Sequence, residues 1–215
     1  MGLEHNTRTI FLSIGDGKIT RRVKEPTGSS KQRTTKEGKV VNEEIYDAVT
    51  GIITDIKVTT HDKYGKFWNV YLQDGEDTYC LQMNYSSGYA SAFLKALPNV
   101  DLSARVKLIP SMKVVDGKKK VTLFINQHGR ALKHFYSKEN PNGLPPMVKT
   151  KFKGQEVWDD TDMMQFLEAM VKTTIVPKLS KTGAVAAPGD APDYEPGEDE
   201  ELTLEAQKIK DQLPF

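Results

Sequence analysis

The chain has little of what secreted, membrane-spanning and disulfide-rich proteins require. Cys80 is its single cysteine, so it can form neither an internal disulfide nor a cysteine zinc site, and a reducing compartment is favoured. No apolar run approaches the roughly 18 residues that span a membrane. The N-terminal residues lack the pattern of a secretory signal. We therefore expect a cytoplasmic protein with no membrane contact.

Signatures of catalysis are missing as well. The four histidines are not spaced as metal ligands, and no Walker-type loop, nucleophile elbow or metalloprotease helix motif occurs. The acidic run at 159–162 has a simpler explanation, because carboxylates stabilise the N-terminal end of a helix. The sequence thus predicts a protein that is not an enzyme and that uses no metal and no cofactor.

Charge is distributed unevenly along the chain. From Pro188 onward, nine acidic residues face two lysines, a net charge of −7, which leaves +8 for the remainder of a chain whose total is +1. A basic body joined to an acidic tail indicates a surface that binds polyanions and a tail that can compete for it. The alternative is a solvated tail without a role.

Residues 1–44 combine a predicted hairpin at 8–23 with a polar, turn-rich segment at 24–39. The composition of that segment is typical of a flexible loop. Its cations either contact phosphates or belong to a solvated linker. They are Lys24, Lys31, Arg33, Lys36 and Lys39.

Residues 45–135 have the clearest β pattern. Five strands are predicted, with one helix between the third and the fourth, and Gly51 indicates a bulge or bend in the first strand. The strands lie at 45–60, 66–73, 77–83, 102–115 and 118–126, and the helix at 86–97. This order matches the partly open five-stranded barrel called the OB-fold, which binds oligonucleotides. We therefore predict a mainly β fold with an OB-fold core, an N-terminal hairpin and a C-terminal helix.

The C-terminal extension, 136–176, contains a predicted helix at 161–173. Its apolar residues fall at helical spacing and should pack on the barrel, although such a stripe can also bind a partner: Met163, Phe166, Leu167, Met170 and Val171. Residues 177–215 have the composition of a disordered acidic tail, and they end in Leu-Pro-Phe.

Aromatic and basic residues alternate on the predicted strands. In 66–73, Trp68, Val70 and Leu72 share the face that should point into the barrel, so Phe67 and Tyr71 turn outward. Phe124 turns outward by the same logic. We predict that these three rings stack on bases, with Tyr64 in the adjacent loop. Two alternatives remain: the rings pack under the hairpin or the helix, or a one-residue slip makes Trp68 the stacking residue.

Cations flank these rings on the strands and on the loops at 61–66 and 115–120. They would neutralise phosphates while the rings stack on bases of any sequence. The predicted phosphate contacts are Lys57, Lys63, Lys66, Arg105, Lys107, Lys118, Lys119 and Lys120.

The OB-like order over 45–126, together with an acidic tail that closes in Leu213-Pro214-Phe215, resembles single-stranded DNA-binding proteins of bacteriophage and bacterial replication. Asp211-Gln212 and two nearby lysines interrupt the acidic run, and the extensions are more similar to the phage proteins. The resemblance implies a host-cell cytoplasmic location for a phage protein. It also implies protection of single-stranded DNA in replication, recombination and repair.

The same resemblance implies that Asp211, Leu213, Pro214 and Phe215 dock into partner enzymes of replication and recombination. A disordered anionic segment with an apolar end suits capture of this kind. A homo-oligomer remains possible. An RNA-binding chaperone on the same fold and a protein scaffold with solvated lysines are the alternative functions.

Overall fold

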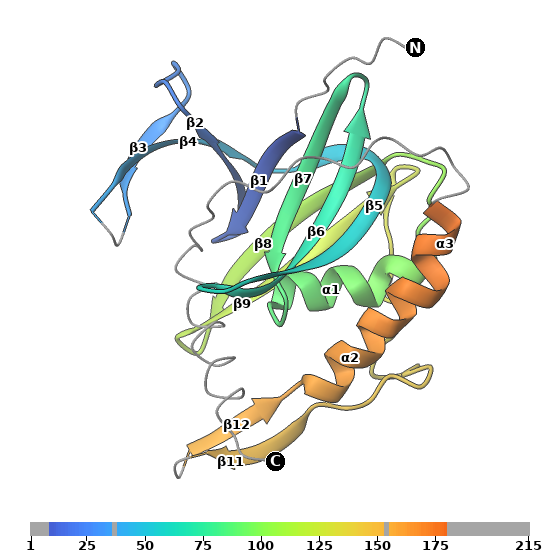
Figure 1. The fold of residues 1–215 in the computed structure, drawn as a ribbon. Helices are drawn as coiled ribbons and strands as arrows, with labels where there is room; N and C mark the ends of the chain where they lie inside the picture. Colours follow the sequence, from blue (N-terminus) through green and yellow to red (C-terminus); the bar gives the residue numbers. More distant parts are fainter. Residues whose placement is uncertain (1–8, 36–37, 153–154, 180–215) are drawn as a thin grey trace.

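The protein is mainly β, and one large mixed sheet contains most of its strands (Figure 1). The computed structural model describes residues 9–35, 38–152 and 155–179. Within these ranges the sheet has the order β10-β9-β8-β5-β6-β7-β1-β2-β4-β3, and β11 and β12 form a separate hairpin. The strands are β1 (Thr9–Gly15), β2 (Lys18–Val23), β3 (Lys31–Thr34), β4 (Val40–Tyr46), β5 (Val49–His61), β6 (Gly65–Asp74), β7 (Asp77–Asn84), β8 (Val106–Val115), β9 (Lys118–Gln127), β10 (Arg130–Ala131), β11 (Val148–Phe152) and β12 (Gln155–Asp159).

Two helical segments pack on the core side of the sheet. The first is α1 (Gly88–Ala96), followed by the 3-10 turn η1 (Leu97–Asn99); the second runs through α2 (Thr161–Met170), the π-helical turn η2 (Val171–Ile175) and α3 (Val176–Leu179). Ser87 caps α1, since its Oγ accepts a hydrogen bond of 3.1 Å from the backbone amide of Ala90. No helix in the described ranges combines the length and apolar character needed to cross a bilayer.

Five neighbouring strands, β9-β8-β5-β6-β7, follow the predicted order, and α1 lies between β7 and β8 in the chain. The five-stranded barrel itself is not confirmed. β1 pairs in parallel with β7, Phe11 opposite Cys80, and so occupies the edge that β9 would need for closure. The mainly β class is confirmed, but the N-terminal hairpin is part of the sheet and not an appendage to a closed barrel.

The turn of that hairpin rests against β8 and α1. The amide of Gly17 donates a hydrogen bond of 2.7 Å to the Tyr89 hydroxyl, and a Cβ at Gly17 would lie 2.8 Å from the backbone nitrogen of Met112. Lys119 forms an ion pair of 2.7 Å with Asp16. These contacts hold the β1–β2 turn beside the β8–β9 hairpin.

Two local predictions are wrong. The segment expected to be a loop contains β3, which pairs with β4 through Gln32 and Asn42. The strand predicted at 45–60 is divided into β4 and β5, and its irregularity lies between Ile53 and Asp55, not at Gly51. Gly51 has a different role, because a Cβ there would lie 2.9 Å from the carbonyl oxygen of Gln73. The shift brings Ile53 and Ile56 into the core together.

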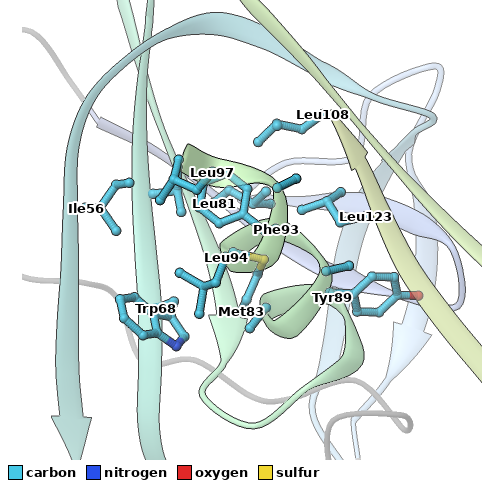
Figure 2. Close-up of a cluster of buried hydrophobic side chains, with 14 of the residues drawn as sticks. Ile56, Trp68, Leu81, Met83, Tyr89, Phe93, Leu94, Leu97, Leu108 and Leu123 are labelled. Carbon is cyan, nitrogen blue, oxygen red and sulfur yellow. The ribbon is translucent and has the colours of Figure 1, made fainter. Parts of the chain in front are cut away.

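The core lies between the curved sheet and the helices (Figure 2). Trp68 and Leu81 of β6 and β7 meet Phe93 and Leu94 of α1, and Leu123 of β9 packs on the same cluster. This confirms the predicted inward sets of β6 and β9. Burial of so many large side chains supplies most of the favourable folding free energy.

The predicted apolar stripe of the C-terminal helix also packs on the body. Met163, Leu167, Met170 and Val171 are buried, whereas Phe166 is partly buried. The hairpin before the helix is β11–β12. Residues 177–179, expected to be disordered, belong to α3, and the remainder of the acidic tail lies outside the described residues.

Candidate nucleic-acid interface

Strands β5, β6, β7, β1 and β2 direct one set of side chains into the core and the other set to the opposite face, which we call the outer face. Strand register aligns one row across it: Lys57 lies opposite Asn69, Asn69 opposite Gln82, Gln82 opposite Ser13, and Ser13 opposite Thr20. The row is polar throughout. The outer face is therefore distinct in chemistry from the core face.

Hydrogen-bonded amides make up the centre of the outer face. Asn69 Nδ2 donates to Thr59 Oγ1 at 2.8 Å, and Gln82 Nε2 donates to Asn69 Oδ1 at 3.0 Å. Both amide side chains are buried. Because buried polar groups are stable only when paired, these bonds fix the side-chain positions on this part of the sheet.

Phe67 and Tyr71 lie on the outer face, as predicted, and neither belongs to the hydrophobic core cluster. The prediction that both rings are displayed to solvent is wrong, because they are only 3% and 7% exposed. Tyr71 lies opposite Asp55 and Cys80, and the Lys57 ammonium is 5.5 Å from the centroid of its ring. Burial raises the pKa of the Tyr71 hydroxyl above its ordinary value.

Trp68 is not a stacking residue in this register. Its ring is buried in the core and stacks on Tyr85 at a centroid distance of 5.6 Å and an interplanar angle of 4°. Lys66, predicted to contact phosphate, is exposed, and its ammonium lies 5.2 Å from the Tyr85 ring centroid.

The hairpin of β8 and β9, which we call the basic hairpin, has a large excess of cations. Its two strands contain no acidic residue, Asp116 in the turn is the only carboxylate, and all five lysines are exposed: Lys107, Lys113, Lys118, Lys119 and Lys120. Lys113 lies directly opposite Lys120. Since like charges at opposed positions destabilise a sheet, this pair costs stability unless an anion lies across it.

Phe124 is the exposed ring of the basic hairpin. It is 46% exposed and lies opposite Ile109, on the face that also carries Lys107 and the Lys113–Lys120 pair. With about 3.4 Å per residue, Lys107 is about 7 Å and Lys113 about 14 Å from Ile109 along the strand. The prediction that Phe124 turns outward is confirmed.

The β5–β6 turn supplies a second accessible ring. Tyr64 is partly exposed; its centroid lies 4.9 Å from that of His61, and the Lys63 ammonium is 5.0 Å from the tyrosine ring. A cation against an aromatic face is attracted by the ring electrons. The turn thus places an aromatic and a basic residue together, as predicted.

Several of the predicted phosphate contacts form ion pairs with carboxylates in the described part of the chain. Lys57 pairs with Asp55 at 2.7 Å. Arg105 pairs with Asp74 at 2.8 Å, and Lys119 pairs with Asp16. These cations remain partly exposed, but an incoming phosphate would have to compete with a carboxylate.

Strands β2, β3 and β4, which we call the wing, carry a further group of cations. Lys31 and Arg33 were predicted as loop cations that could contact phosphate, but their place on a strand and the role of Arg22 were missed. The wing projects from the rest of the sheet (Figure 1). On its outer face, Arg33 holds the buried carboxylate of Glu43 through two hydrogen bonds, and Arg22 lies 3.6 Å from the same carboxylate. The alternation of residues on β2 could have predicted the position of Arg22, because Thr20 and Arg22 lie on one face of the strand and the buried Ile19 lies on the other.

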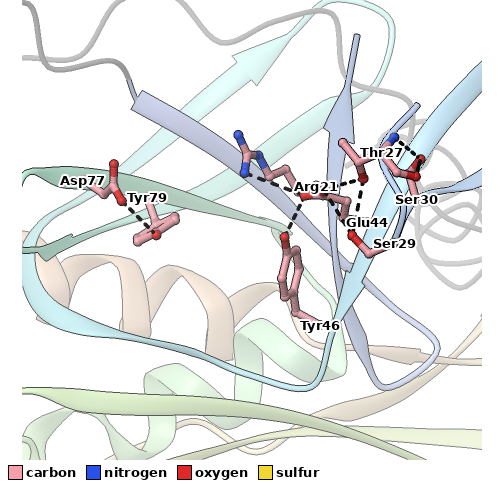
Figure 3. A network of polar contacts seen from close by, with 8 residues as sticks. All are labelled: Arg21, Thr27, Ser29, Ser30, Glu44, Tyr46, Asp77 and Tyr79. Carbon is pink, nitrogen blue, oxygen red and sulfur yellow. Dashed lines mark hydrogen bonds and ion pairs between the residues drawn. The ribbon is translucent and has the colours of Figure 1, made fainter. Parts of the chain in front are cut away.

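The other face of the wing is closed by a different network (Figure 3). Glu44 accepts hydrogen bonds from Tyr46 at 2.7 Å and from Thr27 at 2.8 Å, and Arg21 lies 3.7 Å away. The hydrogen bond from Tyr46 and that from Thr27 hold the pKa of Glu44 below its ordinary value. Each face of the wing thus has one buried glutamate that holds the strands together: Glu43 on the outer face and Glu44 on the other.

Comparison with protein families, with curated proteins and with solved structures finds no significant match. The predicted docking residues of the tail, Asp211, Leu213, Pro214 and Phe215, lie outside the described residues.

Proposed function

We propose that the protein binds single-stranded DNA without sequence preference and has no catalytic role. The observation that carries this proposal is the basic hairpin, where the exposed Phe124 lies on the same face as Lys107 and the opposed pair Lys113–Lys120. A polyanion with flat bases fits this surface. Its phosphates would relieve the repulsion between the lysines, and one base would stack on Phe124.

Stacking explains why the binding would tolerate any sequence, since every base has a π-face. Phe124 and Tyr64 are the rings that we assign to stacking, because both are accessible. Phe67 and Tyr71 are buried, so they would stabilise the outer face without stacking on bases. Among the cations, five have no ion pair in the described part of the chain, so we assign phosphate contacts to them first: Lys66, Lys107, Lys113, Lys118 and Lys120.

The experiment is fluorescence anisotropy with a labelled oligo-dT at low salt. Phe124→Ala should weaken binding by about 5- to 150-fold, which corresponds to the 1–3 kcal/mol of one base stack. Phe135→Ala is the matched control, because Phe135 is also exposed (38%) but lies outside the basic hairpin. Failure of the wild-type protein to bind oligo-dT would overturn the proposal. Tighter binding of the matching RNA would show that the ligand is RNA and not DNA.

The lysine pair gives a second readout. Lys113→Gln with Lys120→Gln should reduce the log–log salt slope of binding by about 1.4, or about 0.7 for each lost phosphate contact. The same variant should be at least as stable as the wild type in a denaturant titration, because the like-charge repulsion is gone. An unchanged slope would show that these two lysines do not contact phosphates of the bound strand.

Recruitment of replication, recombination and repair enzymes by the tail rests on the resemblance of its sequence alone. Deleting residues 199–215 should abolish capture of such enzymes and tighten DNA binding at low salt, because the acidic residues no longer compete for the cations. Weaker DNA binding by the truncated protein would contradict the competition.

A further inference from the structure

The hairpin of β11 and β12 displays a tryptophan that the proposed site on β8 and β9 does not use. The two strands form a sheet of their own and lie apart from the large sheet (Figure 1). The side chain of Trp158 is 54% exposed on this hairpin. A single exposed apolar side chain is ordinary on a protein surface, so the inference depends on what surrounds the ring.

Within the hairpin, the neighbours of Trp158 on its own face are charged. Lys149 lies directly opposite it, and Lys151 lies diagonally to it and opposite Glu156. The Lys149 ammonium is 5.3 Å from the centroid of the Trp158 ring and 2.9 Å from a carboxylate oxygen of Glu156. The exposed Val148 lies on the other face. The ring is thus bordered by two cations and one carboxylate.

The main chain holds this ring in a defined place relative to the core. β12 ends at Asp159, and α2 begins two residues later at Thr161. The Asp159 carboxylate accepts hydrogen bonds from the amide and the hydroxyl of Thr161, at 3.0 and 2.6 Å. Met163 and Leu167 of α2 are buried in the core. Because the ring is positioned before any ligand arrives, binding costs it little conformational freedom.

A flat base with adjacent phosphates fits this surface better than a protein partner does. A protein interface has an apolar centre inside a polar rim, whereas here one aromatic ring lies among charged side chains. Sites for single strands combine such a ring with cations that follow the backbone. As a diagonal neighbour, Lys151 is about 7–8 Å from Trp158, within reach of a long side chain. Lys151 forms no ion pair within the described ranges.

We propose that Trp158 stacks on a base of the bound single strand and that Lys151 contacts a neighbouring phosphate. The inference rests on the proposed function and adds a binding subsite outside the large sheet, on the hairpin that precedes α2. The single strand is then bound at two places, the basic hairpin and β11–β12.

Fluorescence tests the subsite directly, because the chain has two tryptophans and Trp68 is buried in the core. In a Trp68→Phe variant, oligo-dT of about 16 nucleotides should quench the emission of Trp158, with the same midpoint as the anisotropy of the labelled oligomer. The wild type should show this quenching as well, and Trp158→Phe should lose it. The comparison with Trp158→Phe does not depend on the folding of the core variant.

Affinity gives an independent readout. Trp158→Ala should weaken binding of the same oligomer by about 5- to 150-fold, the range for one base stack. Val148→Ala is the matched control, because Val148 is equally exposed (54%) on the other face of the same hairpin, and it should bind like the wild type. Lys151→Gln should lower the log–log salt slope by about 0.7, and an unchanged slope would contradict its phosphate contact.

Binding of oligo-dT without quenching of Trp158, or an equal loss of affinity in Trp158→Ala and Val148→Ala, would overturn the subsite while leaving the basic hairpin intact. A shift of the Trp158 emission with protein concentration, in the absence of DNA, would show that the ring docks on a second copy of the chain and would also overturn it. Failure of the wild type to bind oligo-dT would instead overturn the proposed function.

Discussion

The hydroxyl of Tyr85 donates a hydrogen bond of 2.6 Å to Glu168, a residue 83 positions later in the chain. Tyr85 follows β7 and Glu168 lies in α2, so the bond joins the sheet to the C-terminal helix. Lys172, one helical turn after Glu168, pairs with the same carboxylate. Although burial alone would raise the pKa of Glu168, the hydrogen bonds from Lys172 and Tyr85 hold it below the ordinary value of a glutamate.

Tyr85→Phe should therefore reduce the free energy of unfolding by about 1.5–3 kcal/mol at neutral pH, the range for a hydrogen bond to a charged group. A carboxylate with a lowered pKa stabilises the folded state above its unfolded pKa, and this contribution is lost as the pH falls through the folded pKa. The difference between Tyr85→Phe and the wild type should thus shrink in acid. Denaturant titrations at neutral and acidic pH measure it, and a difference that does not vary with pH would contradict the role of the ionised Glu168.

Gly17 should be far less tolerant of substitution than Gly117, although both have φ of +72°. At Gly117 a Cβ meets nothing within 4 Å, so Gly117→Ala should cost only the strain of a left-handed residue, about 1–2 kcal/mol. At Gly17 the Cβ would lie 2.8 Å from the nitrogen of Met112, in addition to the same strain. Thermal unfolding of the two variants measures the difference, and equal melting temperatures would show that β2 does not approach β8 this closely.

Local patterns in the sequence were sufficient to predict most helices and strands, but not which strands pair along their edges. Alternation identified β6 and β9 with the correct inward faces, and the pattern at 86–97 predicted the helix that is observed as α1 and η1. Neither pattern contains information on which edge β1 joins. Its parallel pairing with β7 is set by the tertiary packing of Ile14 and Leu12 into a core built from distant residues.

The candidate site was predictable to the same limited extent. Alternation correctly predicted that Phe67, Tyr71 and Phe124 point away from the core. It does not distinguish an exposed position on the outer face from a buried one. Arg33 was predicted only as a loop cation, because the polar, turn-rich composition of residues 24–39 favoured a loop, and its pairing with Glu43 beside Arg22 was missed. In the structure, Glu43 and Glu44 are neutralised by side chains of β2 and β3, and this pairing stabilises a strand where composition alone indicates none.

Cys80 should be inert toward thiol reagents in the folded protein. Burial raises the pKa of its thiol to about 12, so almost no thiolate exists near neutral pH. A chromogenic disulfide reagent should react with the cysteine only after denaturant is added, in proportion to the unfolded fraction. Rapid reaction of the native protein would contradict the burial of this part of the outer face.

The two tryptophans provide a direct check of the strand register. Trp68 is 1% exposed and Trp158 is 54% exposed. A Trp158→Phe variant should emit at short wavelength and resist quenching by acrylamide, whereas a Trp68→Phe variant should emit at long wavelength and be quenched readily. Binding of oligo-dT should leave the emission of the Trp158→Phe variant nearly unchanged, because Trp68 points into the core. Since a slip of one residue exchanges the two faces of a strand, long-wavelength emission from native Trp158→Phe would place Trp68 on the outer face and move Phe67 and Tyr71 into the core.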